Sequence, residues 1–586
     1  MASVRTNADL YLVSMKLSDK FNRRLGRFLL WGVPLLMTIP NIALCAYGHM
    51  PQCAILANIL LPLGLVVLFV SIRGRVGLNT LLLLPLMVLA AFQIVLLFLY
   101  ADGSIIGVDM FLNVATTNSS EARELLENLR PAIAVVILLY LPPLVCAVIA
   151  VRRRVRPSCR SKHTARIAGV LLTAAGSVAL GICVAVRPTY HIDEDLYPVN
   201  VICNLGAAFY RSHASANYPE TSSDYTFDAE SSRPDSIREV YIAVIGETSR
   251  ADNWQLFGYG RFTTPELCSL PHDGLVGFDA AFSESNTTHK SVPLLLSTLD
   301  VECFADSIDC VKSVITAFKE AGFRTDAVSM QCRNGSYIDY FLEEADSTIF
   351  QREPRPGTVR TDIYDVDLLR SVDSIMARGA RKQLIVLHQY GSHFNYADRY
   401  PRSEAYFLPD KTTEAKASNR GQLVNAYDNA VRQTDRLLAG LIERLDSLGC
   451  TGGLIYTSDH GEDIFDDARN RFLHASPTPT YFQLHVPMLL YMTRELMATY
   501  PELAANARAN RDCEVSSSAG YAPTLMHMAG LRTHRLDKSR ALTSRQYRPE
   551  SEHLFLSDRN RPETLHEAGF RTEDFERLSR LKNVRR

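Results

Sequence analysis

The fold is decided by the stretch REVYIAVIGETSRADNW at residues 238–254. Its uninterrupted apolar run, residues 240–245, is typical of a strand buried on both faces of a parallel sheet. Two similar runs follow, QLIVLHQYGSH at 383–393 and GGLIYTSDHGED at 452–463. Amphipathic helical patterns lie between the runs, and the longest covers residues 423–449. Alternating strands and helices predict an α/β sandwich built on a mostly parallel sheet.

Polar side chains follow each of these strands at the point where the strand ends. Glu247 follows the first run, His393 the second, and Asp459 with His460 the third. Ligands bind outside the carboxyl ends of the strands in such folds, so we expect these side chains to converge. Carboxylate oxygens and imidazole nitrogens suit Zn²⁺ or Mn²⁺. The sequence therefore predicts a metal site at this edge of the sheet.

A candidate nucleophile lies in FSESNTTHKSVPLLLSTL at residues 282–299, where polar residues lead into an apolar helix. A hydroxyl at the helix start would face the metal and the positive end of the helix, which favours anions such as phosphate. A metal-bound threonine needs no serine-protease triad, because the cation lowers the pKa of the alcohol. The alternative is that Thr287 and Thr288 serve only as helix caps.

The 586 residues form two halves of different character. Lys and Arg number 62 and Asp and Glu number 63, and the resulting net charge of −1 excludes a basic nucleic-acid-binding protein. Residues 1–187 are strongly apolar, whereas residues 188–586 have the mixed composition of a water-soluble domain. Five apolar stretches in the first half are long enough to cross a bilayer as helices, namely 28–47, 52–72, 77–100, 131–151 and 167–187.

The basic residues between the apolar stretches predict an orientation in the membrane. They gather before the first stretch, between the second and third, and in RRRVRPSCRSKHTAR between the fourth and fifth. All of these segments fall on one side, which the positive-inside rule assigns to the cytoplasm. An odd number of spans then places residues 188–586 outside the cytoplasm.

Two segments connect the spans and the soluble domain. The connection 101–130 lies on the outer side and predicts a helix near 109–128, lying at the membrane surface. Asn113, Thr117 and Glu121 share one face of that helix, and spacing alone favours a solvated polar stripe. Residues 188–236 read as a linker that includes an amphipathic interfacial helix. We therefore expect a transmembrane domain at 1–187, the linker, and a catalytic domain at 237–586.

Several motifs in their order resemble the phosphoethanolamine transferases of the Gram-negative envelope, a group within the alkaline phosphatase/sulfatase superfamily. The motifs are VIGETSRADNWQLFGYGRFTTP, SNTTHKSVP, LIVLHQYGSHFNYADRYP, NAYDNAVRQTD and YTSDHGEDI with FLHASPTPTY and HVPMLLY. That group modifies lipid A and includes colistin-resistance enzymes. The resemblance implies five transmembrane helices in the bacterial inner membrane and a periplasmic domain of sulfatase type.

The resemblance also implies roles for individual residues. Thr288 would be the nucleophile, with Thr287 as the alternative. His393 and His474 would contact the phosphoryl group, or a second zinc ion. The zinc ligands would be Glu247, Thr288, Asp459 and His460, and the lipid-headgroup motif would be Asn113, Thr117 and Glu121.

The implied activity is a ping-pong transfer of phosphoethanolamine from phosphatidylethanolamine, through a phosphothreonine, to a phosphate or sugar of lipopolysaccharide. We expect a monomer that lowers surface negative charge and sensitivity to polymyxin. The acceptor stays open, because SESNTTHK and SMQCRNGSYID depart from the colistin-resistance pattern and FLHASPTPTY is closer to the branch acting on core sugars. The alternatives are a glycerol-phosphate transferase similar to lipoteichoic acid synthase, which uses phosphatidylglycerol, and a non-catalytic membrane receptor.

The twelve cysteines add one expectation. Cys45, Cys53, Cys146 and Cys183 lie in or beside the apolar stretches and read as packing residues or free thiols. Cys303 and Cys310 flank a short loop outside the cytoplasm, where disulfides are permitted, and form the one disulfide that we expect.

Overall fold

The computed structural model describes residues 17–46, 51–99, 105–117, 126, 129–271, 273–353, 363–412 and 414–584. The chain divides into two compact units. One comprises residues 1–107 with 125–207, and the other comprises residues 108–124 with 208–586. The segment between the third and fourth apolar stretches is thus split, and its middle part, residues 108–124, belongs to the second unit.

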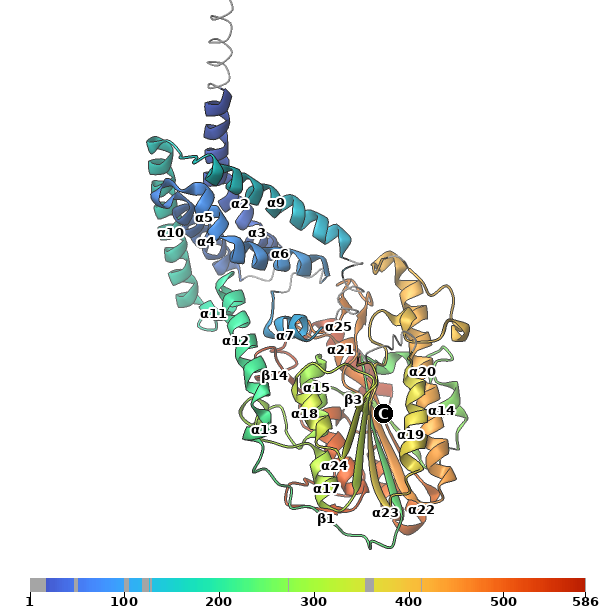
Figure 1. Ribbon diagram of the computed structural model, residues 1–586. Coiled ribbons are helices and arrows are strands. Elements are labelled where there is room, and N and C mark those ends of the chain that lie inside the picture. The colour runs from blue at the N-terminus through green and yellow to red at the C-terminus, as the bar shows by residue number, and fades with distance from the viewer. Residues whose placement is uncertain are drawn as a thin grey trace, which may run out of the picture. The chain divides into compact units, whose positions relative to one another are not determined.

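The first unit is built from apolar helices. Among its described residues, four helices are long and apolar enough to cross a membrane, and a fifth span results if one bent pair counts as a single crossing. The four are Leu17–Ala46, Gln52–Gly74, Arg130–Arg152 (α9) and Cys159–Val186 (α10). The bent pair is Val76–Leu82 (α5) and Leu84–Leu99 (α6), whose axes meet at 55°. Figure 1 shows these helices in blue and cyan.

Helices α4 (Ile55–Ser71) and α10 pack closely because glycines remove side chains from their interface. A Cβ atom at Gly64 would lie 2.5 Å from the Thr173 nitrogen, and one at Gly176 would lie 2.5 Å from the Leu61 nitrogen. Small residues of this kind let helix backbones approach closely in membranes. The antiparallel register of the pair is therefore fixed by backbone contact.

The second unit is organised by an eight-stranded sheet, in the order β11-β3-β10-β7-β2-β6-β4-β5. Only β10 runs antiparallel to its neighbours, so the sheet is mostly parallel, as the alternating pattern predicts. The strands are β2 (Glu239–Gly246), β3 (Leu275–Phe282), β4 (Arg324–Ser329), β5 (Ser347–Phe350), β6 (Lys382–His388), β7 (Thr451–Ser458), β10 (His485–Met492) and β11 (Val515–Ser516).

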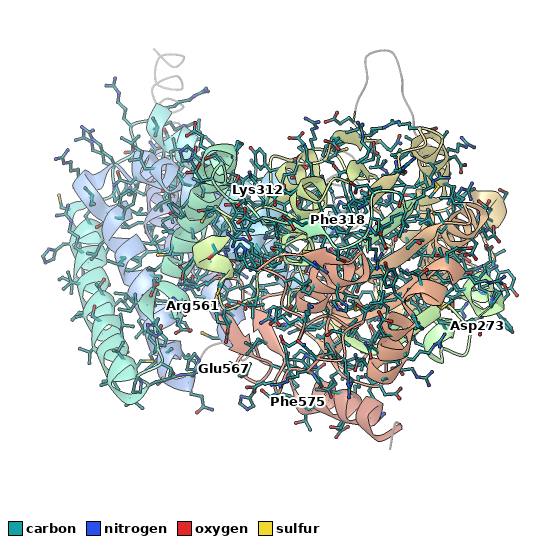
Figure 2. All side chains as sticks on the ribbon, turned by 90° about the horizontal axis from the view of Figure 1, so that it is seen from below. Asp273, Lys312, Phe318, Arg561, Glu567 and Phe575 are labelled. Carbon is teal, nitrogen blue, oxygen red and sulfur yellow. The ribbon has the colours of Figure 1, made fainter. Side chains whose placement is uncertain are left out.

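Side chains of β2 alternate between two hydrophobic cores, one on each face of the sheet. Tyr241 and Ile245 enter the core that contains Phe318, whereas Val240 and Val244 enter the other. Figure 1 shows helices on both faces, and Phe318 is labelled in Figure 2. One face carries α15 (Thr288–Leu296), α17 (Val314–Glu320), α18 (Tyr337–Glu343) and α24 (Ser517–Met528), and the other carries α14 (Pro265–Ser269), α19 (Leu368–Met376) and α20 (Arg420–Ser447).

Shorter helices and strands form the linker and the rest of the second unit. The linker predicted at 188–236 contains α11 (Ile192–Asp195), α12 (Val199–Ala216) and α13 (Tyr218–Thr221). The boundary between the two units falls within α12. The other elements of the second unit are α7 (Val108–Thr116), β1 (Glu230–Ser231), α16 (Phe304–Ser307), β8 (Asp463–Ile464), β9 (Phe472–Leu473), α21 (Tyr481–Leu484), α22 (Arg494–Thr499), α23 (Pro501–Asn510), β12 (Leu531–Arg532), β13 (Leu554–Leu556), β14 (Pro562–Thr564) and α25 (Thr572–Val584).

Candidate metal and phosphoryl site

The ends of β2 and β7 bring three metal-ligating side chains together. The two strands are parallel neighbours in which Gly246 pairs with Ser458, so Glu247 and Asp459 leave the sheet side by side. His460 follows directly. The ligand atoms of Glu247, Asp459 and His460 all lie within 4.8 Å of one another, and the three residues are buried. The predicted convergence at the sheet edge is therefore present in the structure for these residues.

Hydrogen bonds leave one ligand atom of His460 and one of Asp459 available to a cation. The Nδ1 atom of His460 lies 2.9 Å from the Gly461 carbonyl, which can only accept, so Nδ1 carries the proton and the Nε2 lone pair is left for a cation. Asp459 Oδ1 accepts hydrogen bonds from the backbone N–H groups of Thr248 and His460. Asp459 Oδ2 has no hydrogen-bond partner in the described part of the chain and lies 3.2 Å from His460 Nε2.

This donor set fits a zinc ion. Two carboxylates and one imidazole are standard ligands of Zn²⁺, and a buried carboxylate oxygen without a hydrogen bond is costly unless a cation faces it. The second ring nitrogen of His460 is held by a carbonyl, as is usual for metal-bound histidine.

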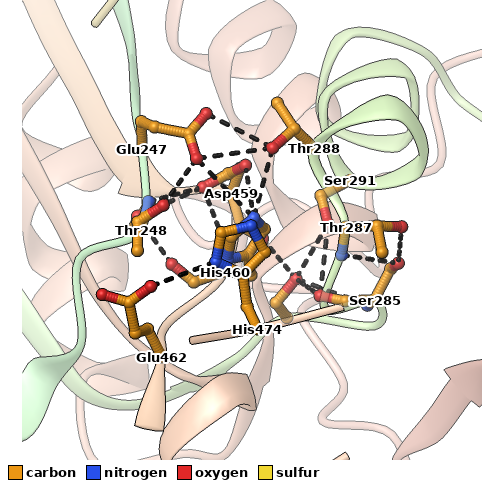
Figure 3. Close-up of polar contacts among 12 residues, drawn as sticks. Glu247, Thr248, Ser285, Thr287, Thr288, Ser291, Asp459, His460, Glu462 and His474 are labelled. Carbon is orange, nitrogen blue, oxygen red and sulfur yellow. Dashed lines mark hydrogen bonds and ion pairs between the residues drawn. The ribbon is translucent and has the colours of Figure 1, made fainter. Parts of the chain in front are cut away.

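Thr288 is the hydroxyl residue that reaches this group. It is the first residue of α15, and its Oγ1 lies 3.2 Å from His460 Nε2 and 3.3 Å from Glu247 Oε2. Thr287, one residue earlier, points to Ser285, at 3.2 Å between the two hydroxyl oxygens. Figure 3 shows the two threonines facing different partners. Thr287 occupies the N-cap position, but its side chain makes no capping hydrogen bond. We name Glu247, Thr288, Asp459 and His460 the strand-end cluster.

His474 and His393 form a row of rings beside the strand-end cluster. The ring centroids of His460 and His474 are 4.2 Å apart, and those of His474 and His393 are 6.0 Å apart. His474 reaches this position because β8 and β9 pair antiparallel and fold the chain back. Burial, aided by the other two histidines, lowers the pKa of His474 well below its ordinary value. A neutral imidazole is therefore favoured there.

Glu462 and Gln331 also face this region, although neither was predicted to be a site residue. The Glu462 carboxylate lies 3.2 Å from His474 Nδ1 and accepts a hydrogen bond from the Tyr396 hydroxyl. Gln331 follows β4 and donates from Nε2 to Glu247 Oε2 at 3.3 Å. Their positions in the sequence could have indicated them, since Glu462 follows Asp459-His460-Gly461 and Gln331 follows the end of another strand, β4.

A second cluster of buried charge adjoins the first. Asp109, near the start of α7, contacts the two residues that follow Thr288, at 3.0 Å to His289 Nε2 and 2.5 Å to Lys290 Nζ. Arg211 bonds Asp109 at 3.4 Å and the Asp558 carbonyl at 2.8 Å. The Asp558 carboxylate accepts the first two N–H groups of α7, from Val108 and Asp109. We name Asp109, Arg211, His289, Lys290 and Asp558 the α7 cluster.

The charges of the α7 cluster compensate one another. Burial alone would raise the pKa of the Asp109 carboxyl, but Lys290, His289 and Arg211 outweigh it and lower this pKa to about 2. Burial lowers the pKa of Lys290, against the attraction of Asp109. His289 lies on α15 and belongs to this cluster.

The predicted headgroup motif is described in part. Asn113 lies on α7, and Thr117 follows its last residue, with the Thr117 backbone N–H donating to the Asn113 carbonyl at 2.8 Å. The two are thus one helical turn apart, as the spacing predicts. Glu121 lies outside the described residues. Helix α7 also carries Asp109, which ties it to the start of α15. Asn113 therefore lies on this tied helix, and Thr117 directly follows it.

The predicted Cys303–Cys310 disulfide is absent from the structure. Both residues are exposed and are free thiols.

Comparisons with known proteins agree with this fold. The sulfatase family profile matches residues 239–531, half of the sequence, and the chain belongs to the sulfatase family. A curated relative is the Kdo(2)-lipid A phosphoethanolamine 7''-transferase of Escherichia coli strain K12, which is 29% identical over 283 residues, covering 47% of this chain and 48% of that protein. The chain thus spans about half the length of the curated relatives that it matches.

Two solved structures share the fold. The integral membrane protein lipooligosaccharide phosphoethanolamine transferase A from Neisseria meningitidis superposes with a TM-score of 0.69 at 21% identity, covering 88% of this chain and 97% of that one. The C-terminal periplasmic domain of EptC from Escherichia coli, in complex with Zn, gives a TM-score of 0.52 at 23% identity, covering 60% of this chain and 98% of that one. The first of these likenesses includes the apolar helices as well as the sulfatase-type domain.

Proposed function

We propose that the protein transfers phosphoethanolamine from phosphatidylethanolamine to a phosphate or sugar of lipopolysaccharide, in two steps through a phosphothreonine at Thr288. The single observation that carries this proposal is the position of Thr288 Oγ1, 3.2 Å from His460 and 3.3 Å from Glu247, at the start of a helix. The names of the matched relatives supply the transferred group. The apolar helices suit lipid substrates, and we place the second unit in the periplasm of a bacterium, anchored in its inner membrane.

The strand-end cluster would hold one zinc ion through Glu247, Asp459, His460 and the Thr288 oxygen. When bound, the ion supplies positive charge that lowers the pKa of the threonine alcohol and neutralises the phosphoryl oxygens. We favour Zn²⁺ over Mn²⁺ because imidazole is a softer ligand than carboxylate or water. A zinc complex of a domain that shares this fold agrees with that choice.

In the first step, Thr288 Oγ attacks the phosphorus and the bond from phosphorus to the glycerol oxygen breaks. Glu247 lies within reach of the Thr288 hydroxyl proton. The positive end of α15 faces the transferring anion. His393 gives a proton to the departing glycerol oxygen, so that diacylglycerol leaves as an alcohol. The phosphoethanolamine stays on Thr288 Oγ.

In the second step, a hydroxyl or phosphate oxygen of the acceptor attacks the same phosphorus. The bond to Thr288 Oγ breaks and the threonine regains its proton. The low pKa of His474 leaves its imidazole neutral, which suits a group that accepts a proton from an acceptor hydroxyl. Placing an ethanolammonium group on an anionic lipid lowers the negative surface charge, and cationic peptides such as polymyxin would then bind less well.

Helix α7 would hold the donor headgroup through Asn113 and Thr117, together with Glu121. What supports this role is the α7 cluster, because Asp109 joins α7 to the two residues after Thr288. A headgroup on α7 therefore lies on an element that contacts the nucleophile segment.

The test uses the full chain purified in detergent with fluorescent phosphatidylethanolamine, and phosphatidylglycerol as a parallel donor. We expect diacylglycerol release and a phosphoethanolamine adduct on the Thr288 peptide, measured by mass spectrometry. Thr288→Ala should abolish both, and Thr287→Ala should retain both. Turnover of phosphatidylglycerol alone would identify a glycerol-phosphate transferase. A protein that binds no zinc and turns over neither lipid would be a receptor.

A further inference from the structure

Two cysteines of the first unit lie against each other at one end of a helix pair. The sulfur atoms of Cys53 and Cys183 are 2.9 Å apart, although the residues are 130 positions apart in the sequence. Cys53 lies in the 3-10 turn Gln52–Ala54 that precedes α4, and Cys183 lies in the last turn of α10. A covalent S–S bond is about 2.0 Å long, so the two atoms need to approach by less than about 1 Å.

The register of α4 against α10 holds the two cysteines opposite each other. The glycine contacts pair Leu61 with Gly176, Gly64 with Thr173, and Leu68 with Gly169. As the residue number rises along α4, the number of the facing residue on α10 falls by the same amount. The same register, continued to the start of α4, brings Cys53 to within one residue of the position opposite Cys183. Close packing along two helical turns therefore fixes the meeting of the thiols, and it does not depend on a flexible loop.

The surroundings of the pair differ for the two thiols. Cys183 is fully buried and packs with Ala54 and Tyr190, whereas Cys53 is half-buried. Cys53 is therefore the thiol that a reagent in solution reaches first. The sequence prediction treated both as packing residues or free thiols, because residues in different spans give no sign of contact.

We propose that Cys53 and Cys183 are a disulfide site that joins the outer ends of α4 and α10. The site rests on the proposed orientation, in which these ends face the periplasm, an oxidising compartment. The oxidant is a protein disulfide of that compartment. The Cys53 thiolate attacks it and forms a mixed disulfide, and Cys183 then displaces the oxidant. The two cysteines lose two protons and two electrons in total, and the oxidant leaves as a dithiol.

The bond would close the loop from Cys53 to Cys183, which contains α5, α6, α7 and α9. Cross-links that close long loops restrict the unfolded chain most. The chain leaves α10 four residues after Cys183 and enters the linker to the second unit, so the bond would also fix the outer end of the last span.

The test is mass spectrometry of the full-length protein, purified from membranes without reductant after alkylation of free thiols with N-ethylmaleimide. We expect one linked peptide pair with Cys53 and Cys183, two hydrogen masses below the free peptides. The pair should vanish in Cys53→Ser and in Cys183→Ser. Cys159 is exposed in the loop predicted to be cytoplasmic, and it serves as the matched control that should be alkylated. Alkylation of both Cys53 and Cys183 in unreduced protein would overturn the proposal.

Thermal unfolding with and without reductant distinguishes a covalent bond between the two cysteines from two thiols that only lie close together. Reductant should lower the unfolding temperature of the wild-type protein and leave that of Cys183→Ser unchanged. An equal response of both proteins would contradict a stabilising cross-link. Neither measurement uses lipid turnover, so loss of the disulfide proposal and loss of the transferase proposal are distinguishable.

Discussion

Thr288 and Lys290, two residues apart on α15, belong to two clusters of buried charge that are balanced in opposite ways. In the α7 cluster, the carboxylate of Asp109 faces Lys290 and Arg211, cations that the protein itself supplies. In the strand-end cluster, the only ion pair of Asp459 within the described ranges is with His460, and Asp459 Oδ2 lacks a hydrogen bond. The first cluster compensates its own charge, whereas the second contains a buried carboxylate oxygen without a hydrogen bond, which fits the metal site that we propose.

From this difference we infer that the α7 cluster positions the segment around Thr288, whereas the strand-end cluster takes part in the reaction. A self-compensated buried cluster costs stability when one partner is removed, because a charge is left unpaired. In a metal site, by contrast, binding of the metal contributes directly to the free energy of folding. Substitutions in the two clusters should therefore affect different measured quantities, and the following predictions are ordered by the size of the expected effect.

The largest effect should come from Thr288→Ala. We expect phosphoethanolamine transfer to fall roughly 10⁵-fold or more, because loss of a nucleophile removes the covalent route. Thr288→Ser keeps the hydroxyl and should retain part of the rate, measured as diacylglycerol release. Thr287→Ala is the matched control, since its hydroxyl faces Ser285. If Thr287→Ala were inactive and Thr288→Ala active, the nucleophile would be Thr287.

Asp459→Asn should lower transfer roughly 10⁴-fold through loss of the metal, a cost comparable to removing a central catalytic group. The substituted protein should bind less zinc, measured by atomic emission on the purified chain. With chelator present, its unfolding temperature should equal or exceed that of the wild type, because a buried negative charge has been removed. A marked loss of stability in chelator would show that Asp459 is already compensated within the protein.

Lys290→Met should act on stability instead. We expect a loss of about 3–5 kcal/mol, since Asp109 is left buried beside one fewer cation. Adding Asp109→Asn should restore part of the loss, because the two changes act on one ion pair. Zinc content should stay at the wild-type value. Thermal unfolding of the single and double variants gives the coupling, and strictly additive losses would contradict it.

The pH dependence of the α7 cluster follows from the lowered pKa of Asp109. Its folded value of about 2 lies below the value of about 3.9 expected in the unfolded chain. The stabilisation is therefore complete above about pH 4 and is lost as the pH falls toward 2. The difference in unfolding free energy between wild type and Asp109→Asn should shrink by about 2–3 kcal/mol across that range. Both proteins are measured with chelator, and a difference that is constant with pH would contradict the assigned ionisation.

The smallest effect should come from Asn113→Ala on α7. We expect KM for phosphatidylethanolamine to rise about 10-fold with little change in kcat, as befits a lost headgroup contact. Stability should be unchanged, because Asn113 is only partly buried. Val114→Ala, on the exposed side of the same helix, is the matched control. A fall in kcat at constant KM would assign Asn113 to the reacting group instead.

Much of the strand-end cluster could be predicted because parallel strands impose it. The apolar runs at 240–245, 383–387 and 452–456 identify central strands, and parallel strands end at one edge. Glu247 and Asp459 were therefore expected at the same edge, and the structure brings them together because β2 and β7 are neighbours. Glu462 and Gln331 were not predicted as site residues, because their partners, Tyr396 and Glu247, come from elements distant in sequence.

Contacts between cysteines, unlike the strand-end residues, could not be predicted from the sequence. Cys303 and Cys310 are close in sequence, which suggested a bond, yet both are free and exposed. Cys53 and Cys183 are far apart in sequence, yet their sulfur atoms are 2.9 Å apart. Closeness in sequence does not determine whether two cysteine side chains point toward each other. The glycine contacts between α4 and α10 set the register of these helices, and this register brings Cys53 and Cys183 together.

The sequence by itself determined the two halves of the protein, the mostly parallel sheet and the polar residues at its strand ends, because hydrophobic periodicity is a local property and alternating strands and helices favour parallel strands. Tertiary structure alone decided which threonine faces the ligands, since Thr287 and Thr288 differ only in direction at the start of α15. It also decided the α7 cluster, in which Asp109 meets Lys290 across 181 positions of the chain. Such contacts depend on how distant elements pack, and no residue pattern within either segment encodes the other.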